Sequence, residues 1–577
     1  MRGDLVTEQT DNGFTQDQIA CLMSALTKLD LTAPSGGKTP AEHVYGTPLE
    51  DLCKEEIAKY KLHPLDIWDR LEHWTARNEI ATGLDQFLLR HLGFFNVEPA
   101  SRGYMIRLRL PACQMRGDQM QAVAEIADTY GPGHAHVTTR GNLQVREIAP
   151  KDVLKVMDAL TEAGLSCQGS GADSARNLTT SPTAGFDPVE LINLAPHTRR
   201  LSNLILNKRD LRALPRKFNI SFDNGGSISA LSDSNDIAFQ AVKVGNDAPV
   251  DPGIYCRIGL GGISGHRDLT RETGMVCTPD QTVMAGFAML MVFVEHADRT
   301  NRKRARLKYL LDAKGLEWFI EATQAKLAEI DAGFQLTALN PTHDLPRPPV
   351  DRHAHIGVHP QSDARCEYAG IALEMGRLSC DQMRSLGRIA MVHGRNDIRL
   401  TVWQNVLIPH LKAGQIDQVK QDLHAVGLGT SATAFAAGAV ACTGKTACKL
   451  GLAHTKEDGT ALVRHLENRF TLDTPINIHL TGCPNSCAQH YIGDIGLVGA
   501  TTTEGETGYH VVVGGGSDHD KGIGRALCGP VPHTQLNDVI AQVVGSYLDR
   551  REGQETFLSF VRRLPDADLA TLCDTSF

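Results

Sequence analysis

The chain has 577 residues, of which 42% are hydrophobic and 22% are charged, and its formal net charge is −9. It is too long for a single hydrophobic core, so we expect several domains, and its acidic balance argues against general nucleic-acid binding while leaving room for local basic patches. The longest apolar run, residues 283–294, is too short to cross a bilayer, and the N-terminus resembles neither a secretory signal nor a transit peptide, so we predict a cytoplasmic protein without membrane spans.

The first part of the chain predicts a helical region followed by a small β-α-β-α unit. Residues 1–95 have mostly helical character. Residues 104–110 then alternate in polarity, which predicts a strand, and helical spacing follows from Asp118. A further strand is expected around Thr138, before a second helix. We predict that residues 96–166 form one ferredoxin-like half-module.

This unit recurs later in the chain. Asp118 and the two residues after it reappear as Asp381-Gln382-Met383, which is 263 positions further on, and Thr138 matches Thr401 at the same distance. The register holds without a gap, which chance similarity rarely achieves. We therefore predict a second half-module at residues 362–430, and we expect the two half-modules to pair into one larger sheet.

A longer stretch of mixed helices and strands follows each half-module, at residues 167–335 and 431–577. These stretches also resemble each other, since residues 218–221 parallel residues 476–479. A glycine-rich strand end in each stretch lacks the full dinucleotide-binding fingerprint, so we do not predict nucleotide binding.

The two halves are joined by residues 336–361, which are rich in proline and histidine and predict an extended linker. His343, His353, His355 and His359 have the chemistry of metal ligands. Histidines that are scattered along a linker are more often solvated, and we adopt that interpretation.

Four cysteines form the most specific motif of the chain. Cys442 and Cys448 have the spacing C-x5-C, and Cys483 and Cys487 have the spacing C-x3-C. Two loops would supply four thiolates, which is the number that a cubane iron–sulfur cluster needs. Structural zinc sites use narrower cysteine pairs than C-x5-C. The other ten cysteines are too sparse for a disulfide scaffold and are expected to be packing residues.

Only the second half carries these cysteines, whereas the first half offers cations in the corresponding region. They are Arg107, Arg109, Arg140, Arg176, Arg216 and Lys217. A duplicated scaffold with metal on one side and positive charge on the other indicates a site between the halves. The cluster would deliver electrons there, and the cations would hold an anion.

Several motifs, together with both cysteine pairs, resemble the sirohaem nitrite and sulfite reductases. They are MIRLRLP at 105–111, VTTRGN at 137–142, LPRKFN at 214–219, NRKRARLKY at 301–309, GVHPQ at 357–361 and LTVWQN at 400–405. The resemblance covers roughly residues 60–577. It implies a duplicated α+β fold in which two ferredoxin-like half-modules and two α/β domains are related by a pseudo-twofold axis.

The resemblance also implies the cofactors and their ligands. Cys442, Cys448, Cys483 and Cys487 would bind a [4Fe–4S] cluster, and Cys487 would bridge to the sirohaem iron as its axial ligand. A shared thiolate would couple the two redox centres directly. The side chains expected to contact the sirohaem and its carboxylates are Arg176, Arg216, Arg302, Arg304, Arg306 and Asn485. The basic run at 302–308 is expected on a helix.

For the substrate, the resemblance implies that Arg107 and Arg140 bind the anion and that Lys217 donates protons. Asn219 stands where the sulfite enzymes generally have a second lysine, and residues 173–176 (DSAR) resemble the nitrite-type loop. Nitrite carries less negative charge than sulfite near neutral pH, so a pocket with one cation fewer suits nitrite. We therefore predict an assimilatory nitrite reductase that takes six electrons to form ammonium.

No flavin or NAD domain is evident, so reduced ferredoxin or flavodoxin is the expected electron donor, and we expect a monomer. Three alternatives remain open at this stage. A sulfite reductase would have the same scaffold. A precorrin-3B synthase has similar cysteine motifs but is usually shorter. A zinc-stabilised interaction protein is disfavoured by the C-x5-C spacing.

Overall fold

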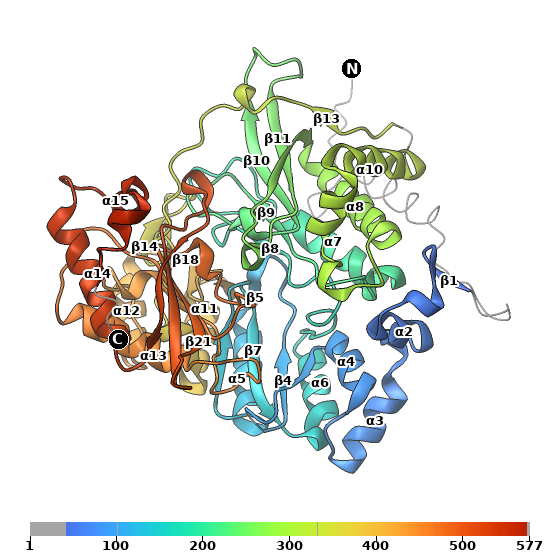
Figure 1. Cartoon of the computed structure of the whole chain (residues 1–577), viewed down its shortest axis with the longest axis horizontal. Helices are drawn as coiled ribbons and strands as arrows, with labels where there is room; N and C mark the ends of the chain where they lie inside the picture. Colours follow the sequence, from blue (N-terminus) through green and yellow to red (C-terminus); the bar gives the residue numbers. More distant parts are fainter. Residues whose placement is uncertain (1–41, 101, 332, 574–577) are drawn as a thin grey trace, which may run out of the picture.

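The computed structural model describes residues 42–100, 102–331 and 333–573. Its helices and strands follow one another in two consecutive halves, and each half contains a small half-module and a larger α/β domain (Figure 1). Within the predicted helical N-terminal region, the described residues form α2 (Lys54–Lys61), α3 (Trp68–Arg77) and α4 (Gly83–Leu89) before the strand β3 (Phe94–Asn96). The prediction for residues 1–41 lies outside the described residues.

The duplication of the half-modules is confirmed. The first comprises β4 (Tyr104–Arg107), α5 (Gly117–Thr129), β6 (His134–Val137), β7 (Leu143–Ile148) and α6 (Val153–Glu162). The second comprises β15 (Cys366–Ile371), α11 (Cys380–His393), β17 (Asp397–Leu400), β18 (Val406–Lys412) and α12 (Ile416–His424). The prediction of a strand around Thr138 is wrong in detail, because Thr138 lies in the turn between β6 and β7. Two strands, not one, stand between the two helices of each half-module.

The two half-modules exchange strands, and the expectation of one larger sheet is wrong. The short strand β5 (Gln114–Arg116) pairs with β17 of the second half-module, and β16 (Arg377–Ser379) pairs with β6 of the first. The result is two five-stranded sheets. One has the order β14-β15-β18-β17-β5, in which β14 is Gly357–Pro360, and the other has the order β16-β6-β7-β4-β3. Each sheet is therefore completed by a strand from the other half, which locks the halves together.

Helices α5 and α11 cross at close range and belong to one core shared by both half-modules. Their contact requires glycine at one position on each helix. A Cβ atom on Gly117 would lie 2.5 Å from the carbonyl oxygen of Gly387, and a Cβ atom on Gly387 would lie 2.6 Å from the carbonyl oxygen of Gly117. Any larger residue would push the two helices, and with them the two halves, apart.

The α/β domains also correspond over the first five strands of each sheet, and the first domain adds a sixth. The first has β8 (Thr179–Thr180), β9 (Ile220–Asp223), β10 (Ile237–Val244), β11 (Gly253–Leu260), β12 (Arg271–Cys277) and β13 (Thr337–Ala338). The second has β19 (Ala439–Ala441), β20 (Ile478–Thr481), β21 (Ile495–Thr501), β22 (Thr507–Val513) and β23 (Arg525–Pro532). In both sheets the first three strands are parallel and the following pairs are antiparallel.

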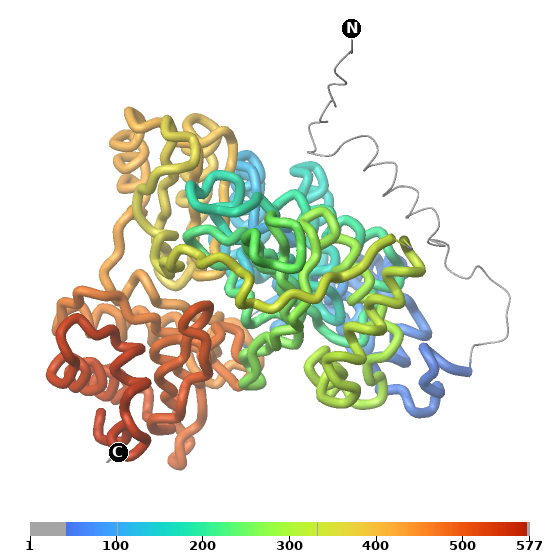
Figure 2. Tube along the Cα trace, turned by 90° about the horizontal axis from the view of Figure 1, so that it is seen from above, coloured from blue at the N-terminus to red at the C-terminus, as the bar shows by residue number. Residues whose placement is uncertain are grey.

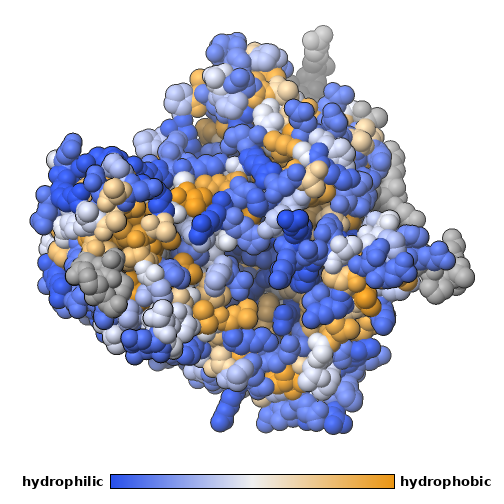
Figure 3. All heavy atoms as spheres, in the orientation of Figure 1, coloured by the Kyte–Doolittle hydropathy of each residue, from blue (hydrophilic) through white to orange (hydrophobic). Residues whose placement is uncertain are grey.

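Each of these sheets packs against helices over its own hydrophobic core. In the first domain these include α7 (Ala195–Asn207) and α8 (Thr282–His296), and in the second α13 (Thr455–Glu467) and α14 (Leu536–Arg550). The apolar run at 283–294 is the buried part of α8. No helix among the described residues is long and apolar enough to span a membrane. The face drawn in Figure 3 is mostly hydrophilic, with small separated apolar areas.

The linker crosses the molecule from the first α/β domain to the second half-module, as the yellow segment in Figure 2 shows. The linker is not solvated along its whole length. The interpretation of its histidines as solvated side chains is therefore wrong for His355. This side chain is 0% exposed and stacks on Trp403, with 4.9 Å between ring centroids and 10° between ring planes. His353 is partly buried, and its Nε2 lies 3.0 Å from the side-chain amide of Asn477. The linker therefore packs into the second half.

Candidate active site

The four cysteines lie on two neighbouring loops. Cys442 directly follows β19, Cys483 and Cys487 follow β20, and these two strands are parallel neighbours. Because parallel strands end at the same edge of a sheet, their loops meet there. The backbone N–H of Gly482 donates to Cys442 Sγ at 3.1 Å, and that of Leu452 donates to the Gly482 carbonyl at 2.7 Å.

The thiols of the four cysteines lie close enough to influence one another's pKa values. Burial, reinforced by the nearby Cys487, raises the pKa of Cys442 to about 11. Burial also raises the pKa of Cys483, with contributions from Cys487 and Cys448. Among the described residues, no three His, Cys, Asp or Glu side chains converge closely enough to hold a single metal ion. The four cysteines of the two loops match the number of thiolates that a cubane cluster needs.

The first half reaches across to both cysteine loops. Thr139 Oγ1 donates to the Cys487 carbonyl at 2.8 Å. Arg146, on β7, donates to Thr443 Oγ1 at 2.6 Å and to the Ala447 carbonyl at 2.8 Å, and so holds both ends of the C-x5-C loop. The cysteines are thus fixed to the half that carries the cations.

Three of the predicted substrate residues lie within electrostatic range of Cys487. Burial lowers the pKa values of Arg107, Arg140 and Lys217, and for each of them the charge of Cys487 opposes that shift. The pKa of Lys217 falls well below its usual range because repulsion from Arg140, Arg306 and Arg176 adds to burial. The pKa of Arg176 is likewise lowered by burial and then by Arg107. These cations repel one another, which favours an anion among them.

Neutral amides, not carboxylates, hold Arg140. Its Nη1 donates to Asn235 Oδ1 at 2.6 Å, and its Nη2 donates at 2.9 Å to Asn219 when the Asn219 amide oxygen is turned toward it. An arginine bound by carboxylates would have its charge cancelled, whereas here the charge stays available to an anion. Asn219 is therefore a direct neighbour of the predicted anion-binding residue.

The predicted cofactor arginines have different surroundings. Arg302 forms a two-fold ion pair with Asp173, at 2.5 and 2.8 Å, and Arg306 pairs with Asp236 at 2.7 and 3.2 Å. Arg216 lies 3.9 Å from Asp173. The charges of Arg302 and Arg306 are thus largely balanced within the protein.

The basic run does not form one helix as expected. Arg304 is exposed on a single turn of 3-10 helix (Arg302–Arg304), and α9 (Leu307–Lys314) starts only after Arg306. Asn485 is exposed beside the cluster loop, and its Nδ2 donates to Cys483 Sγ at 3.4 Å.

Sequence reasoning missed several residues of the site. Asp236 could have been found from the repeat, because the residue 258 positions later is also an aspartate, Asp494. The two aspartates are equivalent in the structure: Asp236 accepts from the backbone N–H of Asn219, and Asp494 from that of Asn477, both at 2.8 Å. Asn235 and Arg146 had no such signal. Their roles depend on contacts between segments that are far apart in the chain.

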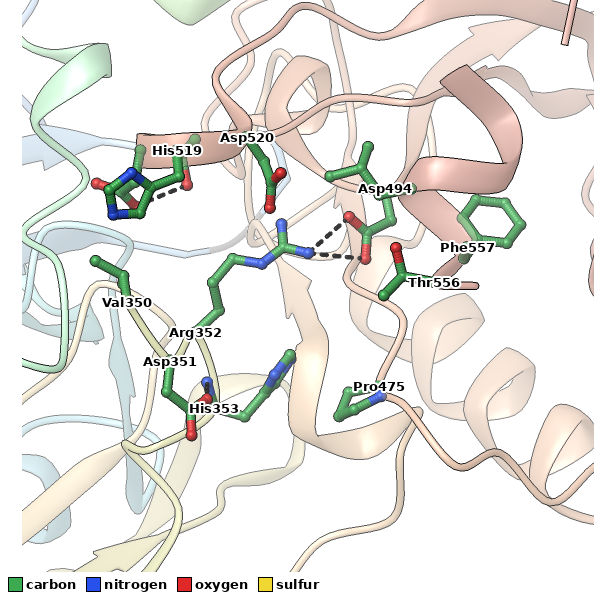
Figure 4. A pocket seen from close by; sticks show the side chains of 13 residues that line it. Val350, Asp351, Arg352, His353, Pro475, Asp494, His519, Asp520, Thr556 and Phe557 are labelled. Atoms are coloured by element: carbon green, nitrogen blue, oxygen red, sulfur yellow. Dashed lines mark hydrogen bonds and ion pairs between the residues drawn. The ribbon is translucent and has the colours of Figure 1, made fainter. Parts of the chain in front are cut away.

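A separate cavity of about 340 Å³ lies in the second half, at the place that corresponds to this site. Figure 4 shows Arg352 extending between Asp494 and Asp520, and the Arg352 Nη2 donates to Asp494 at 3.0 Å. This pair repeats the pairing of Arg306 with Asp236. The position equivalent to Lys217 is Pro475, which lines the cavity. The second half thus repeats the frame of the site with a proline in place of the lysine.

Two family models match the chain. The model described as the nitrite and sulphite reductase 4Fe-4S domain matches residues 171–330 and 435–562. The model described as the nitrite/sulfite reductase ferredoxin-like half domain matches residues 98–163 and 359–426. Each model therefore matches once in each half.

Similar proteins extend over most of the chain. A ferredoxin–nitrite reductase from Synechococcus elongatus is 30% identical over 512 residues, which is 86% of this chain and 96% of that protein. One from Leptolyngbya laminosa is 31% identical over 491 residues, or 83% of this chain and 92% of that protein. The solved structure of the Mycobacterium tuberculosis NirA protein is similar with a TM-score of 0.81 and 25% identity, covering 90% of this chain and 97% of that one.

Proposed function

Because the chain belongs to the nitrite and sulphite reductase family, we propose that it is an assimilatory ferredoxin-dependent nitrite reductase that converts nitrite to ammonium in the cytoplasm. The observation that carries this proposal is the group of cations around Cys487, in which Arg140 is held by neutral amides. Such a group binds a small anion next to a source of electrons.

The residues present fit the two cofactors that the family implies, a [4Fe–4S] cluster and sirohaem. Cys442, Cys448, Cys483 and Cys487 would hold the cluster, and Cys487 would also ligate the sirohaem iron. Sirohaem carries many carboxylates, which suits a region where burial and the neighbouring charges of Arg107, Arg216 and Arg306 lower the pKa of Arg176, against the opposing charge of Asp173. When bound, these groups supply the substrate with single electrons.

The protein's own part in the reaction is to bind the anion and provide protons. Nitrite takes up six electrons and eight protons to give ammonium and two waters. Arg107 and Arg140 would hold the nitrite oxygens, since both side chains stay cationic at neutral pH. The lowered pKa of Lys217 makes its ammonium group a better acid, so we assign it the donation of protons to the departing oxygen. Asn219 keeps this pocket one cation short of the sulfite-type pattern.

The test is anaerobic purification followed by iron and sulfide analysis, an absorption spectrum, and assays of nitrite and sulfite with chemically reduced methyl viologen. We expect four irons in the cluster plus one in the haem, and faster turnover of nitrite than of sulfite. Faster turnover of sulfite would refute the choice of substrate, and a colourless zinc protein would refute the whole proposal. Lys217→Met should abolish nitrite reduction, whereas Lys303→Met, at an exposed position of the basic run, should not.

A further inference from the structure

The loop between Cys442 and α13 exposes two large apolar side chains. Leu450 is 57% exposed and Leu452 is 41% exposed, and both follow Cys448 within four residues. We propose that Leu450 and Leu452, together with Lys445 and Lys449, form the docking surface for an acidic ferredoxin that reduces the cluster. This inference rests on the proposed function, and it names the face of the protein by which electrons enter.

The exposure of these leucines is built into the loop. The backbone N–H of Lys445 donates to the Ala453 carbonyl at 2.7 Å, that of Gly451 to the Cys448 carbonyl at 2.9 Å, and that of Leu452 to the Gly482 carbonyl at 2.7 Å. These bonds tie both sides of the loop to each other and to the second cysteine loop. Because the backbone is fixed in this way, the leucines are presented to solvent by a defined structure.

The charges around the leucines favour an acidic partner. Lys445 and Lys449 are both exposed. The pKa of Lys449 is lowered, chiefly by partial burial and then by repulsion from the nearby Arg90. The whole chain has a net charge of −9, so an acidic carrier is repelled by the molecule as a whole and must be drawn to a local basic area. An apolar centre with a charged rim is the usual anatomy of a transient protein interface.

The position suits electron entry. Cys448 is a proposed cluster ligand, and Lys449 directly follows it, so a protein bound on this loop would lie next to the cluster. On the other side of the same loop, Arg146 contacts Thr443 and Ala447. The loop is therefore held from within, while the side chains of Leu450 and Leu452 remain exposed.

The test compares two electron donors with the intact holoenzyme. The variants are Leu450→Ser and Lys445→Glu, neither of which changes a cysteine or its direct neighbour. With a reduced cyanobacterial ferredoxin as donor, each should raise the KM for ferredoxin about tenfold, because a central apolar contact or a favourable charge is lost. With reduced methyl viologen, which needs no docking surface, the rate and the iron content should match those of the wild type.

Matched controls are Val392→Ser, at a valine that is 64% exposed on α11, and Lys412→Glu, at the end of β18. Both should leave the KM for ferredoxin unchanged. An unchanged KM in Leu450→Ser and Lys445→Glu would overturn the proposal, as would an equal loss with both donors.

A second measurement separates this inference from the proposed function. Stopped-flow bleaching of the cofactor absorbance by reduced ferredoxin requires no substrate. If the wild type fails to reduce nitrite with methyl viologen, the proposed function is wrong, yet slower bleaching in the two variants than in the controls would still support the docking surface. Equal bleaching rates in variants and controls would refute it.

Discussion

Asp173 provides the sharpest test of how the site is held. Its carboxylate is 0% exposed, pairs with Arg302 at 2.5 and 2.8 Å, and lies 3.5 Å from Lys59 Nζ of α2. Burial alone would raise the pKa of Asp173, but attraction to Lys59 and Arg302 outweighs it and lowers the pKa from 3.8 to about 2. That difference corresponds to about 2 kcal/mol of stability at neutral pH.

Asp173→Asn should cost more than this, since it leaves the partly buried Arg302 without its two-fold partner and leaves the buried Lys59 with Glu56 as its carboxylate partner. Breaking one side of a buried ion pair typically costs about 3–5 kcal/mol. We expect a loss of about 3 kcal/mol at pH 7, measured by urea unfolding followed by tryptophan fluorescence. The matched control is Asp363→Asn. Its carboxylate also has a pKa lowered to about 2, chiefly by the hydrogen bond from Arg365, but Arg365 is 86% exposed, so the change should have no measurable effect.

The pH dependence gives an independent check. A carboxylate whose pKa is lower in the folded than in the unfolded state stabilises fully above the unfolded value and loses that contribution as the pH falls through the folded value. The wild type should therefore lose the stability contributed by Asp173 between about pH 4 and pH 2, and Asp173→Asn should lack this part of the acid-induced loss. Equal stability of Asp173→Asn and wild type at pH 7 would refute the reasoning.

Three further changes probe the cofactor and substrate residues. Cys487→Ser should abolish the coupled absorption spectrum of the two cofactors, and an unaltered spectrum would refute the bridging role. Asn219→Lys should raise the rate ratio of sulfite to nitrite, by about tenfold for one added cation beside Arg140; a constant ratio would show that Asn219 does not discriminate. Lys456→Met should lower the reduction potential of the cluster in an EPR-monitored titration, because it removes a buried cation that interacts electrostatically with Cys442. Burial and Arg146 lower the pKa of this lysine to about 7. Lys456→Arg should keep the potential near that of the wild type.

The repeat was readable from the sequence because equivalent residues keep a fixed distance, so that Asp118 and Asp381 start the same helix in both half-modules. Strand exchange could not be predicted from the sequence. Both β5 and β16 are three-residue strands, and the partner of each lies in the other half-module, more than two hundred residues away. Local periodicity carries no information about which distant edge a strand will join.

The site was predictable to the extent that its residues lie in motifs. The cysteine spacing and the cations near Arg107, Arg140 and Lys217 could be recognised, whereas the pairing of Arg302 with Asp173 could not. A run of basic residues has the same appearance whether its members bind a ligand or an internal carboxylate. The burial of His355 was missed for a related reason, since its environment is made by Trp403 and not by the linker that carries it.

The two halves share one duplicated frame but differ at the proposed anion site. Both keep the aspartate that accepts from the backbone of Asn219 or Asn477, and both pair that aspartate with an arginine. The difference lies in the side chains that would face an anion. Where the first half has Lys217 and Arg140, the equivalent positions of the second half are Pro475 and Trp403.

The linker completes this difference. His355 covers Trp403, and the site equivalent to Arg107 is Gly370, where a Cβ atom would lie 2.4 Å from the His355 carbonyl oxygen. In the second half the linker thus packs where the first half has these cations. The second half supplies the four cysteines, which the first half lacks. Neither half alone contains both the four cysteines and the cations, so under the proposed function the strand exchange and the contacts of Thr139 and Arg146 that join the halves are themselves requirements of the chemistry.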